Sequence, residues 1–197
     1  MPALSRLYVR LPNWVGDVCM SLPALHLLQR SGLALALCAR PWAQDLLAGL
    51  PAHDFVPMRG GLWEDRRSVS THRRVLGDGA RFARGLLLPD SLSSALVFRL
   101  AGLACAGYRD EGRSLLLRWP VAKPDGHLHT VESWHYLARA ALRRWNEPIA
   151  EDAPGPRLDL PLTPTHREAA DALLREQGLA GVPFVLIAPT AVGLHHG

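Results

Sequence analysis

The chain has 197 residues, of which 48% are hydrophobic and 20% charged, a length and composition that allow one α/β domain or one domain plus the start of another. No window approaches the ~18–20 uninterrupted apolar residues of a membrane helix, and Met1–Trp14 lacks the segments of a secretory signal, so we expect a cytoplasmic protein without a transmembrane segment. The net charge of +4 suits anionic partners, but no nucleic-acid-binding module is present.

Strand-like apolar runs alternate with helical patterns along most of the chain. The expected strands are Leu7–Leu11, Leu33–Ala39, Phe55–Met58, Gly85–Pro89 and Cys105–Tyr108. The expected helices are Val18–Arg30, one beginning near Pro41, a surface helix within the arginine-rich span Arg59–Arg84, one capped by Asp90 or Ser91, and Thr130–Trp145. This order predicts an α/β fold, a Rossmann-like doubly wound parallel sheet with right-handed crossovers.

Two of the expected helices have a recognisable apolar face. For the helix capped by Asp90 or Ser91, the predicted face consists of Leu92, Leu96 and Leu100. For the later helix it consists of Trp134, Leu137, Ala141 and Trp145. Residues at these spacings lie on one side of an α-helix, so both faces are predicted to pack against the sheet.

A proline-rich and acidic stretch, Pro148–Pro164, has the composition of a linker. A helix over Thr165–Gln177 and an apolar strand over Phe184–Pro189 are expected beyond it. We therefore expect residues 1–155 to form one domain, and residues 156–197 to supply the linker, the helix and the first strand of a second domain.

The sequence offers no metal or dinucleotide motif. Cys19, Cys38 and Cys105 are widely spaced and are expected to be reduced, mostly buried thiols. His127 and His129 lack a third ligand. Neither G-x-G-x-x-G nor a phosphate-binding P-loop occurs, which argues against a dinucleotide-dependent enzyme on the same type of sheet.

The most informative segment is the loop between the first strand and the first helix. It places Gly16 and Asp17 at the carboxyl end of a parallel strand, where ligands gather in open α/β sheets. A carboxylate there can accept a proton from a substrate hydroxyl. The alternative is that Asp17 only caps the following helix, and spacing alone does not decide between the two roles.

The motifs of this chain resemble those of the ADP-heptose:lipopolysaccharide heptosyltransferases, glycosyltransferase family 9. The resemblance rests on L-P-N-W-V-G-D-V-C-M-S-L-P-A-L ending at Leu25, on L-L-P-D-S-L-S-S-A-L ending at Leu96, and on G-Y-R-D-E-G-R-S-L-L ending at Leu116. Arg40–Ala43 and Val131–Glu132 add shorter matches in the same order. The details are closest to the heptosyltransferase II branch.

The resemblance implies a two-domain GT-B arrangement, in which the first domain binds the acceptor and the second binds the nucleotide-sugar. It implies inverting, metal-independent transfer of heptose from ADP-heptose to the lipopolysaccharide inner core, without a cofactor. The partners would be ADP-heptose and a lipid A-core acceptor, met in the cytoplasm or peripherally at the cytoplasmic face of the inner membrane.

The resemblance also assigns roles to residues. Asp17 is expected to be the catalytic base. The expected acceptor-binding residues are Asn13, Trp14, Gly16, Ser91, Ser94, Arg59, Arg66 and Arg113, with Arg67 and Arg109 as further candidates for anionic groups. Thr190 is expected to touch the donor diphosphate. For Trp14 a core packing role is the alternative, and for Ser91 a helix cap.

Two departures from the family pattern stand out. Asp90 replaces the usual asparagine of the L-P-N-S segment, and the sequence stops at Gly197, in the loop where the family approaches a lysine and a W-P pair. We therefore expect the donor half to be missing and the chain alone to transfer little or no heptose. The alternative function is a non-catalytic acceptor-binding fragment or decayed gene product.

Overall fold

The computed structural model describes residues 6–51, 53–76, 83–110, 112–124, 126, 128–149 and 155–187. It divides into two compact units, residues 1–161 and residues 162–197. Each unit is described by itself.

A six-stranded parallel sheet forms the first unit. Its strands are β1 (Arg6–Arg10), β2 (Ala34–Ala39), β3 (His53–Pro57), β4 (Ala83–Leu87), β5 (Leu103–Tyr108) and β6 (Trp119–Val121). Their order is β3-β2-β1-β4-β5-β6, and all neighbours are parallel. The predicted Rossmann-like, doubly wound fold is confirmed. The sequence did not predict β6, a three-residue edge strand that contains Pro120, which an edge position tolerates.

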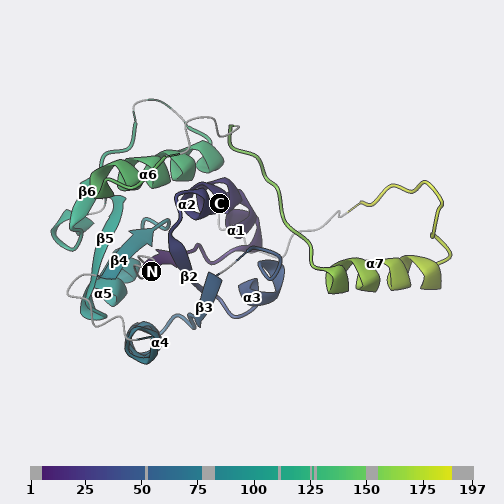
Figure 1. The fold of residues 1–197 in the computed structure, drawn as a ribbon, viewed down its shortest axis with the longest axis horizontal. Helices are drawn as coiled ribbons and strands as arrows, with labels where there is room; N and C mark the ends of the chain where they lie inside the picture. Colours follow the sequence, from purple (N-terminus) through teal and green to yellow (C-terminus); the bar gives the residue numbers. More distant parts are fainter. Residues whose placement is uncertain are drawn as a thin grey trace, which may run out of the picture. The chain divides into compact units, whose positions relative to one another are not determined.

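Helices cover both faces of this sheet (Figure 1). They are α1 (Val15–Met20), α2 (Leu22–Arg30), α3 (Ala43–Leu46), α4 (Leu62–Val75), α5 (Leu92–Leu100) and α6 (Thr130–Trp145), with a short 3₁₀ turn, η1 (Arg113–Leu115). Alternate strand residues point to opposite faces. Leu7 and Val9 therefore share a core with α2 and α6, whereas Tyr8 shares a second core with α4 and α5.

Two predictions about the helices were wrong in detail. The helix expected over Val18–Arg30 is two helices that meet at Ser21, because Pro23, in the first turn of the second helix, has no N–H to continue the first. The predicted apolar face of α5 is also wrong, since Leu92 and Leu100 are exposed. Its buried side chains are instead Ser94, Ala95, Val97 and Phe98.

The predicted apolar face of α6 is confirmed. Trp134, Leu137, Ala141 and Trp145 are all buried against the α2 side of the sheet. The helix begins with a capping box, in which His129 Nδ1 accepts the N–H of Val131 and a Glu132 carboxylate oxygen accepts the N–H of His129. This start fixes the first turn of α6 beside the carboxyl ends of β4 and β5.

The second unit contains α7 (Pro164–Glu176), which Thr163 caps through a hydrogen bond from the N–H of His166. None of its residues is buried. The strand expected at Phe184–Pro189 is not present over residues 184–187, the part of it that the structure describes. The side chain of Leu186 is 86% exposed, because no neighbouring strand in the described residues pairs with this segment.

Candidate functional site

Loops from several strands meet at the carboxyl edge of the sheet. The chain leaves β1 toward β2 and β3 on one side and returns through β4 to β5 and β6 on the other. The boundary between β1 and β4 is therefore the topological switch point, where open α/β sheets bind their ligands. Two pockets lie at this edge, one on each side of the loop between β4 and α5.

The first, which we call the serine–arginine pocket, has a volume of about 270 Å³. Its lining comes from the ends of β1, β2, β3 and β4 and includes Arg10, Asn13, Arg40, Ser91 and Ser94. Three residues predicted to bind the acceptor, Asn13, Ser91 and Ser94, are thus brought together by the fold. Their role in binding stays a prediction.

Arg10 is the last residue of β1, and its side chain is 5% exposed. Its guanidinium donates to the carbonyl oxygen of Leu11, to that of Cys38 at 3.4 Å and to Asn13 Oδ1 at 2.7 Å. Burial lowers the pKa of the Arg10 guanidinium, yet an arginine remains charged in proteins. The side chain therefore fixes Asn13 and places a positive charge at the base of the pocket.

Ser91 is the N-cap of α5, so the capping role weighed for it is observed. Its Oγ accepts the N–H of Ser94 at 3.3 Å and shares a hydrogen bond with Ser94 Oγ at 2.7 Å. Capping does not withdraw Ser91 from the pocket, because the same hydroxyl belongs to the lining. The pocket therefore opens onto the positive end of the α5 dipole.

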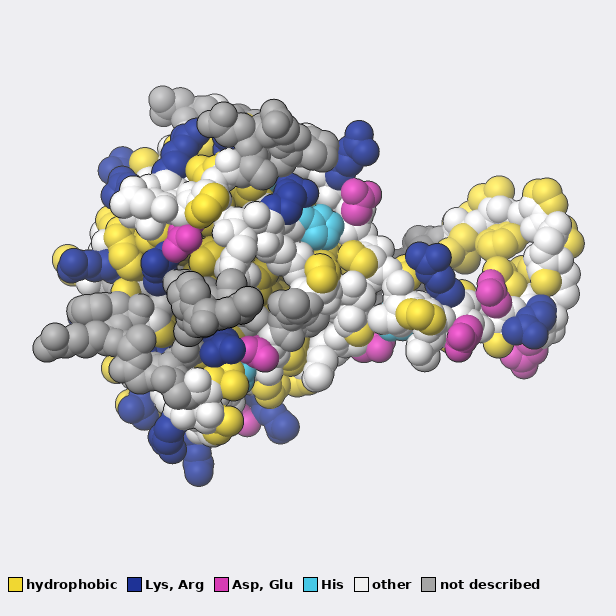
Figure 2. All heavy atoms as spheres, viewed as in Figure 1, with side chains coloured by type: hydrophobic (Ala, Val, Ile, Leu, Met, Phe, Trp, Pro, Cys, Tyr) yellow, Lys and Arg dark blue, Asp and Glu magenta, His cyan; other side chains and the backbone are white. Residues whose placement is uncertain are grey.

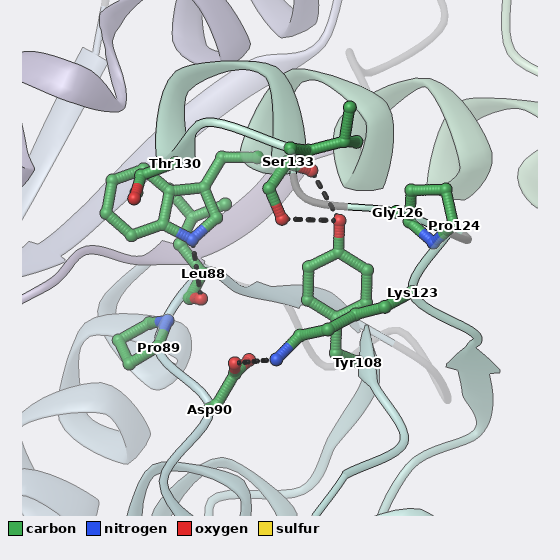
Figure 3. A pocket seen from close by; sticks show the side chains of 11 residues that line it. Leu88, Pro89, Asp90, Tyr108, Lys123, Pro124, Gly126, Thr130 and Ser133 are labelled. Carbon is green, nitrogen blue, oxygen red and sulfur yellow. Dashed lines mark hydrogen bonds and ion pairs between the residues drawn. The ribbon is translucent and has the colours of Figure 1, made fainter.

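The second pocket, which we call the lysine pocket, has a volume of about 360 Å³ and lies at the ends of β4, β5 and β6 (Figure 3). Tyr108 donates its hydroxyl to the carbonyl oxygen of Ser133 and accepts from Ser133 Oγ at 3.0 Å. Trp134 Nε1 donates to the carbonyl oxygen of Leu88 at 2.9 Å. These bonds attach the start of α6 to the ends of β4 and β5.

Lys123 crosses the lysine pocket between two carboxylates. Its Nζ lies 2.8 Å from Asp90 Oδ2 and 2.6 Å from Asp110 Oδ2, and 5.4 Å from the centroid of the Tyr108 ring. Hydrogen bonds to Asp110 and Asp90 raise the pKa of Lys123. Asp90, the residue that departs from the family motif, therefore holds a cation that an asparagine would not pair with.

Arg113 bonds to the loop between β4 and α5, which lies between the two pockets. It is fully buried and donates to the carbonyl oxygens of Tyr108 and Pro89, both at 2.7 Å, and to Asp90 Oδ1 at 3.2 Å. The guanidinium of Arg113 is bonded to the protein and does not reach solvent, and its role in binding an anionic acceptor group stays a prediction. Arg113 is a positioning residue for the loop between β4 and α5.

Asp17 lies in the first turn of α1, four residues after Asn13. Its side chain is half-buried, and among the described residues no hydrogen bond or ion pair to its carboxylate is found. Its side chain does not cap α1, because the N-cap position belongs to Trp14. Trp14 itself is 69% exposed, so its alternative role as a core residue is excluded, and the neighbouring Gly16 is exposed as well.

The remaining predicted arginines lie outside both pockets. Arg59 is 69% exposed and lies 3.6 Å from Glu64, while Arg66 is exposed and donates to the carbonyl oxygen of Leu100 at 3.2 Å. Figure 2 shows Lys and Arg side chains at several separate places on one face, so basic charge alone does not locate a site there. Thr190 lies outside the described residues.

The described residues offer no candidate for a membrane-spanning helix or a metal site. No helix among them has the length and apolar character to cross a bilayer, and no group of three or more His, Cys, Asp or Glu side chains among them could hold a metal ion. Cys38 and Cys105 are buried free thiols whose pKa is raised by burial, and Cys19 is half-buried.

The fold and the edge define a class of protein: a Rossmann-like α/β domain with pockets at the switch point of its sheet. The sequence profile of glycosyltransferase family 9 (heptosyltransferase) matches residues 69–195, and the chain belongs to this family. No curated protein sequence matches it significantly.

Solved structures of heptosyltransferases are similar to this chain. Escherichia coli ADP-heptose lipopolysaccharide heptosyltransferase II is 26% identical, with a TM-score of 0.62 over 86% of this chain and 50% of that one. E. coli heptosyltransferase WaaC with ADP is 20% identical, with a TM-score of 0.60 over 79% of this chain and 51% of that one. A family 9 glycosyltransferase from Veillonella parvula is 12% identical, with a TM-score of 0.68 over 89% and 50%. The chain thus spans about half the length of these structures.

Sequence reasoning missed several residues of the two pockets, among them Arg10, Arg40, Tyr108 and Lys123. Arg40 directly follows a predicted strand, Tyr108 ends one and Arg10 is the last but one residue of another, which is the signal that could have found them. Lys123 follows β6, the strand that was not predicted, so its position at the edge had no such signal.

Proposed function

We propose that this chain is the acceptor-binding part of a heptosyltransferase that transfers heptose from ADP-heptose to a hydroxyl of the lipopolysaccharide inner core. Membership of family 9 and the 26% identity to E. coli heptosyltransferase II support the proposal. ADP and ADP-2-deoxy-2-fluoro heptose are named as ligands of E. coli heptosyltransferase WaaC, which supports the same donor here. The transfer inverts the anomeric carbon and uses no metal.

The observation that carries the proposal is the position and environment of the Asp17 carboxylate. Its carboxylate is half-buried at the carboxyl edge of the sheet, in the first turn of α1, and has no hydrogen-bond or ion-pair partner among the described residues. Asn13, at the start of the same loop, lines the serine–arginine pocket. An acceptor sugar held in this pocket can present a hydroxyl to Asp17, which takes the proton as the hydroxyl oxygen bonds to the anomeric carbon and ADP leaves.

The test is an Asp17→Asn variant in a chimera, in which the matched part of this chain replaces the corresponding half of E. coli heptosyltransferase II. Removing a general base costs about 10²–10⁴-fold in rate, so we expect kcat to fall at least 100-fold while the KM for the acceptor changes little. Product would be quantified by mass spectrometry of the heptosylated glycan.

The matched control is Asp54→Asn. Asp54 is a carboxylate of β3 at the amino end of the strand, away from the pockets, and pairs with Arg6 at 3.1 Å. This variant is expected to keep at least half of the parent chimera's activity. Equal activity of Asp17→Asn and its parent would remove Asp17 from the mechanism.

A further inference from the structure

One carboxylate at the carboxyl edge pairs with two cations in different surroundings. Asp90 Oδ1 lies 3.2 Å from Arg113 Nη2, and Asp90 Oδ2 lies 2.8 Å from Lys123 Nζ. The Arg113 side chain is fully buried, whereas the Lys123 side chain is 46% exposed. An asparagine has one acceptor oxygen and an amide nitrogen that only donates. It could keep the bond to Arg113, but the pair with Lys123 depends on the aspartate.

Lys123 links three segments that lie far apart in the sequence. Asp90 lies in the loop between β4 and α5, Asp110 lies between β5 and η1, and Lys123 follows β6. Lys123 Nζ is 2.6 Å from Asp110 Oδ2, so this second carboxylate anchors the ammonium group. Figure 3 shows the Lys123 side chain extending past the Tyr108 ring to reach Asp90. One side chain thus ties the ends of β4, β5 and β6 together.

The loop that Lys123 holds leads directly into the serine–arginine pocket. Ser91, the residue after Asp90, is the N-cap of α5 and accepts the N–H of Ser94 at 3.3 Å. Ser91, Ser93 and Ser94 all belong to the lining of that pocket. Consecutive Cα atoms are held ~3.8 Å apart by the peptide bond. A displacement of Asp90 therefore displaces the cap and the hydroxyls that follow it.

This link is expected to matter more for binding than for stability. Lys123, Asp90 and Asp110 are partly exposed, and water screens such ion pairs, so they add little to the free energy of unfolding. Function is more sensitive to position, because a misplacement of about 1 Å can reduce the rate of an enzyme about 100-fold. A variant that lacks the pair should therefore stay folded and bind the acceptor poorly.

We propose that Lys123 is a positioning residue for acceptor binding, which acts through its ion pair with Asp90 on the start of α5. The pair keeps Ser91 and Ser94 where they meet the ligand of the serine–arginine pocket. This inference rests on the proposed function, under which the acceptor lies in that pocket. Lys123 itself does not touch the acceptor, because its ammonium group is occupied by Asp90 and Asp110.

The first measurement uses no ligand. Amide hydrogen exchange of the Ser94 N–H, which bonds to Ser91 Oγ in the cap, is followed by NMR on the complete 197-residue chain. Without its ion pair, the cap in Lys123→Met should open more often, so we expect this exchange to become at least about threefold faster. The matched control is Arg118→Met, an exposed arginine that directly precedes β6. It should leave the exchange rate of Ser94 unchanged.

The second measurement is calorimetric titration of the same chain with a heptosylated inner-core oligosaccharide. Lys123→Met and Asp90→Asn should each raise Kd at least about fivefold. The double variant should bind no more weakly than the weaker single variant, because both substitutions break the same pair. Lys123→Arg keeps a cation between the two carboxylates and should bind nearly as well as the parent, as should Arg118→Met.

Unchanged exchange of Ser94 in Lys123→Met would overturn the inference, since the lysine would then not hold the helix start. Additive losses of affinity in Lys123→Met and Asp90→Asn, or tighter binding by Asp90→Asn, would overturn it as well. Either result would show that Lys123 contacts the ligand directly, because Asp90→Asn releases the ammonium group from one of its two partners.

The failure of this inference differs from the failure of the proposed function. No binding of the oligosaccharide by the parent chain would remove the proposed function and, with it, any role of Lys123 toward the acceptor. Normal binding by the parent together with equally tight binding by Lys123→Met would remove the positioning role alone, and would leave the assignment of Asp17 in place.

Discussion

The two pockets at the carboxyl edge differ in how their charges are paired. In the lysine pocket, Lys123 lies between Asp90 and Asp110, and Asp90 also pairs with Arg113. In the serine–arginine pocket, the guanidinium groups of Arg10 and Arg40 bond to neutral oxygens. The first pocket is held by its own ion pairs, whereas the arginines of the second are held by neutral acceptors. A pocket's volume therefore says less about its use than the balance of its charges.

The largest effect on stability is expected for Arg113→Met, which removes the buried guanidinium that holds the loop between β4 and α5. The substitution leaves the carbonyl oxygens of Tyr108 and Pro89 without their donor and Asp90 without one of its two cations. We expect the free energy of unfolding to fall by about 3 kcal/mol, measured by urea denaturation. Arg109→Met, an exposed arginine of the same loop, should stay within about 0.5 kcal/mol of the parent. Equal losses of unfolding free energy in the two variants would show that the loop between β4 and α5 does not depend on the buried guanidinium.

The lysine pocket also depends on an indole hydrogen bond. Trp134→Phe removes the donor to the carbonyl oxygen of Leu88 and should cost about 1–2 kcal/mol. Trp145→Phe on the same helix is the matched control, because Trp145 is similarly buried and its Nε1 has no partner among the described residues. We expect the second substitution to cost less in thermal or urea unfolding. The reverse order would contradict the role given to the bond.

The ion pairs of Lys123 are expected to matter less, since Lys123 is 46% exposed. Lys123→Met should cost less than about 1 kcal/mol. Hydrogen bonds to Asp110 and Asp90 raise the pKa of Lys123 above its unfolded value, so its contribution is complete below that value and disappears as the pH rises through the folded one. The difference between parent and variant should therefore be constant from pH 6 to 9 and shrink in strong alkali. A difference that grows with pH would contradict this sign.

The smallest effect concerns two histidines between α2 and α6, away from the pockets. Burial lowers the pKa of His26, with Arg30 adding to it and Asp159 opposing it. Burial also lowers the pKa of His135, with Arg139 and Arg30 adding to it. Their stabilising contribution is complete above the unfolded value of about 6.5 and is lost as the pH falls below it.

Replacing both histidines by glutamine should flatten the dependence of the free energy of unfolding on pH between 7 and 5. Urea denaturation at the two pH values measures it. An unchanged slope would show that other groups set the acid sensitivity of the fold.

Sequence patterns predicted the parallel sheet and the face of α6, because buried strands and long amphipathic helices have strong periodicities. They failed for α5, because Leu92 and Leu100 suggested an apolar face that is exposed in the structure. The buried side chains of α5 lie on another face of the helix. They also did not predict the burial of Arg113, since its acceptors among the described residues come from the ends of β4 and β5 and the loop after β4. Burial of a charged side chain depends on such tertiary contacts, which a linear pattern does not contain.

The most direct test of the central claim is calorimetric titration of the complete chain with a heptosylated inner-core oligosaccharide and, separately, with ADP-heptose. We expect saturable binding of the oligosaccharide, retained in Asp17→Asn. No binding of the oligosaccharide, or its displacement by ADP-heptose, would contradict the assignment of this domain to the acceptor.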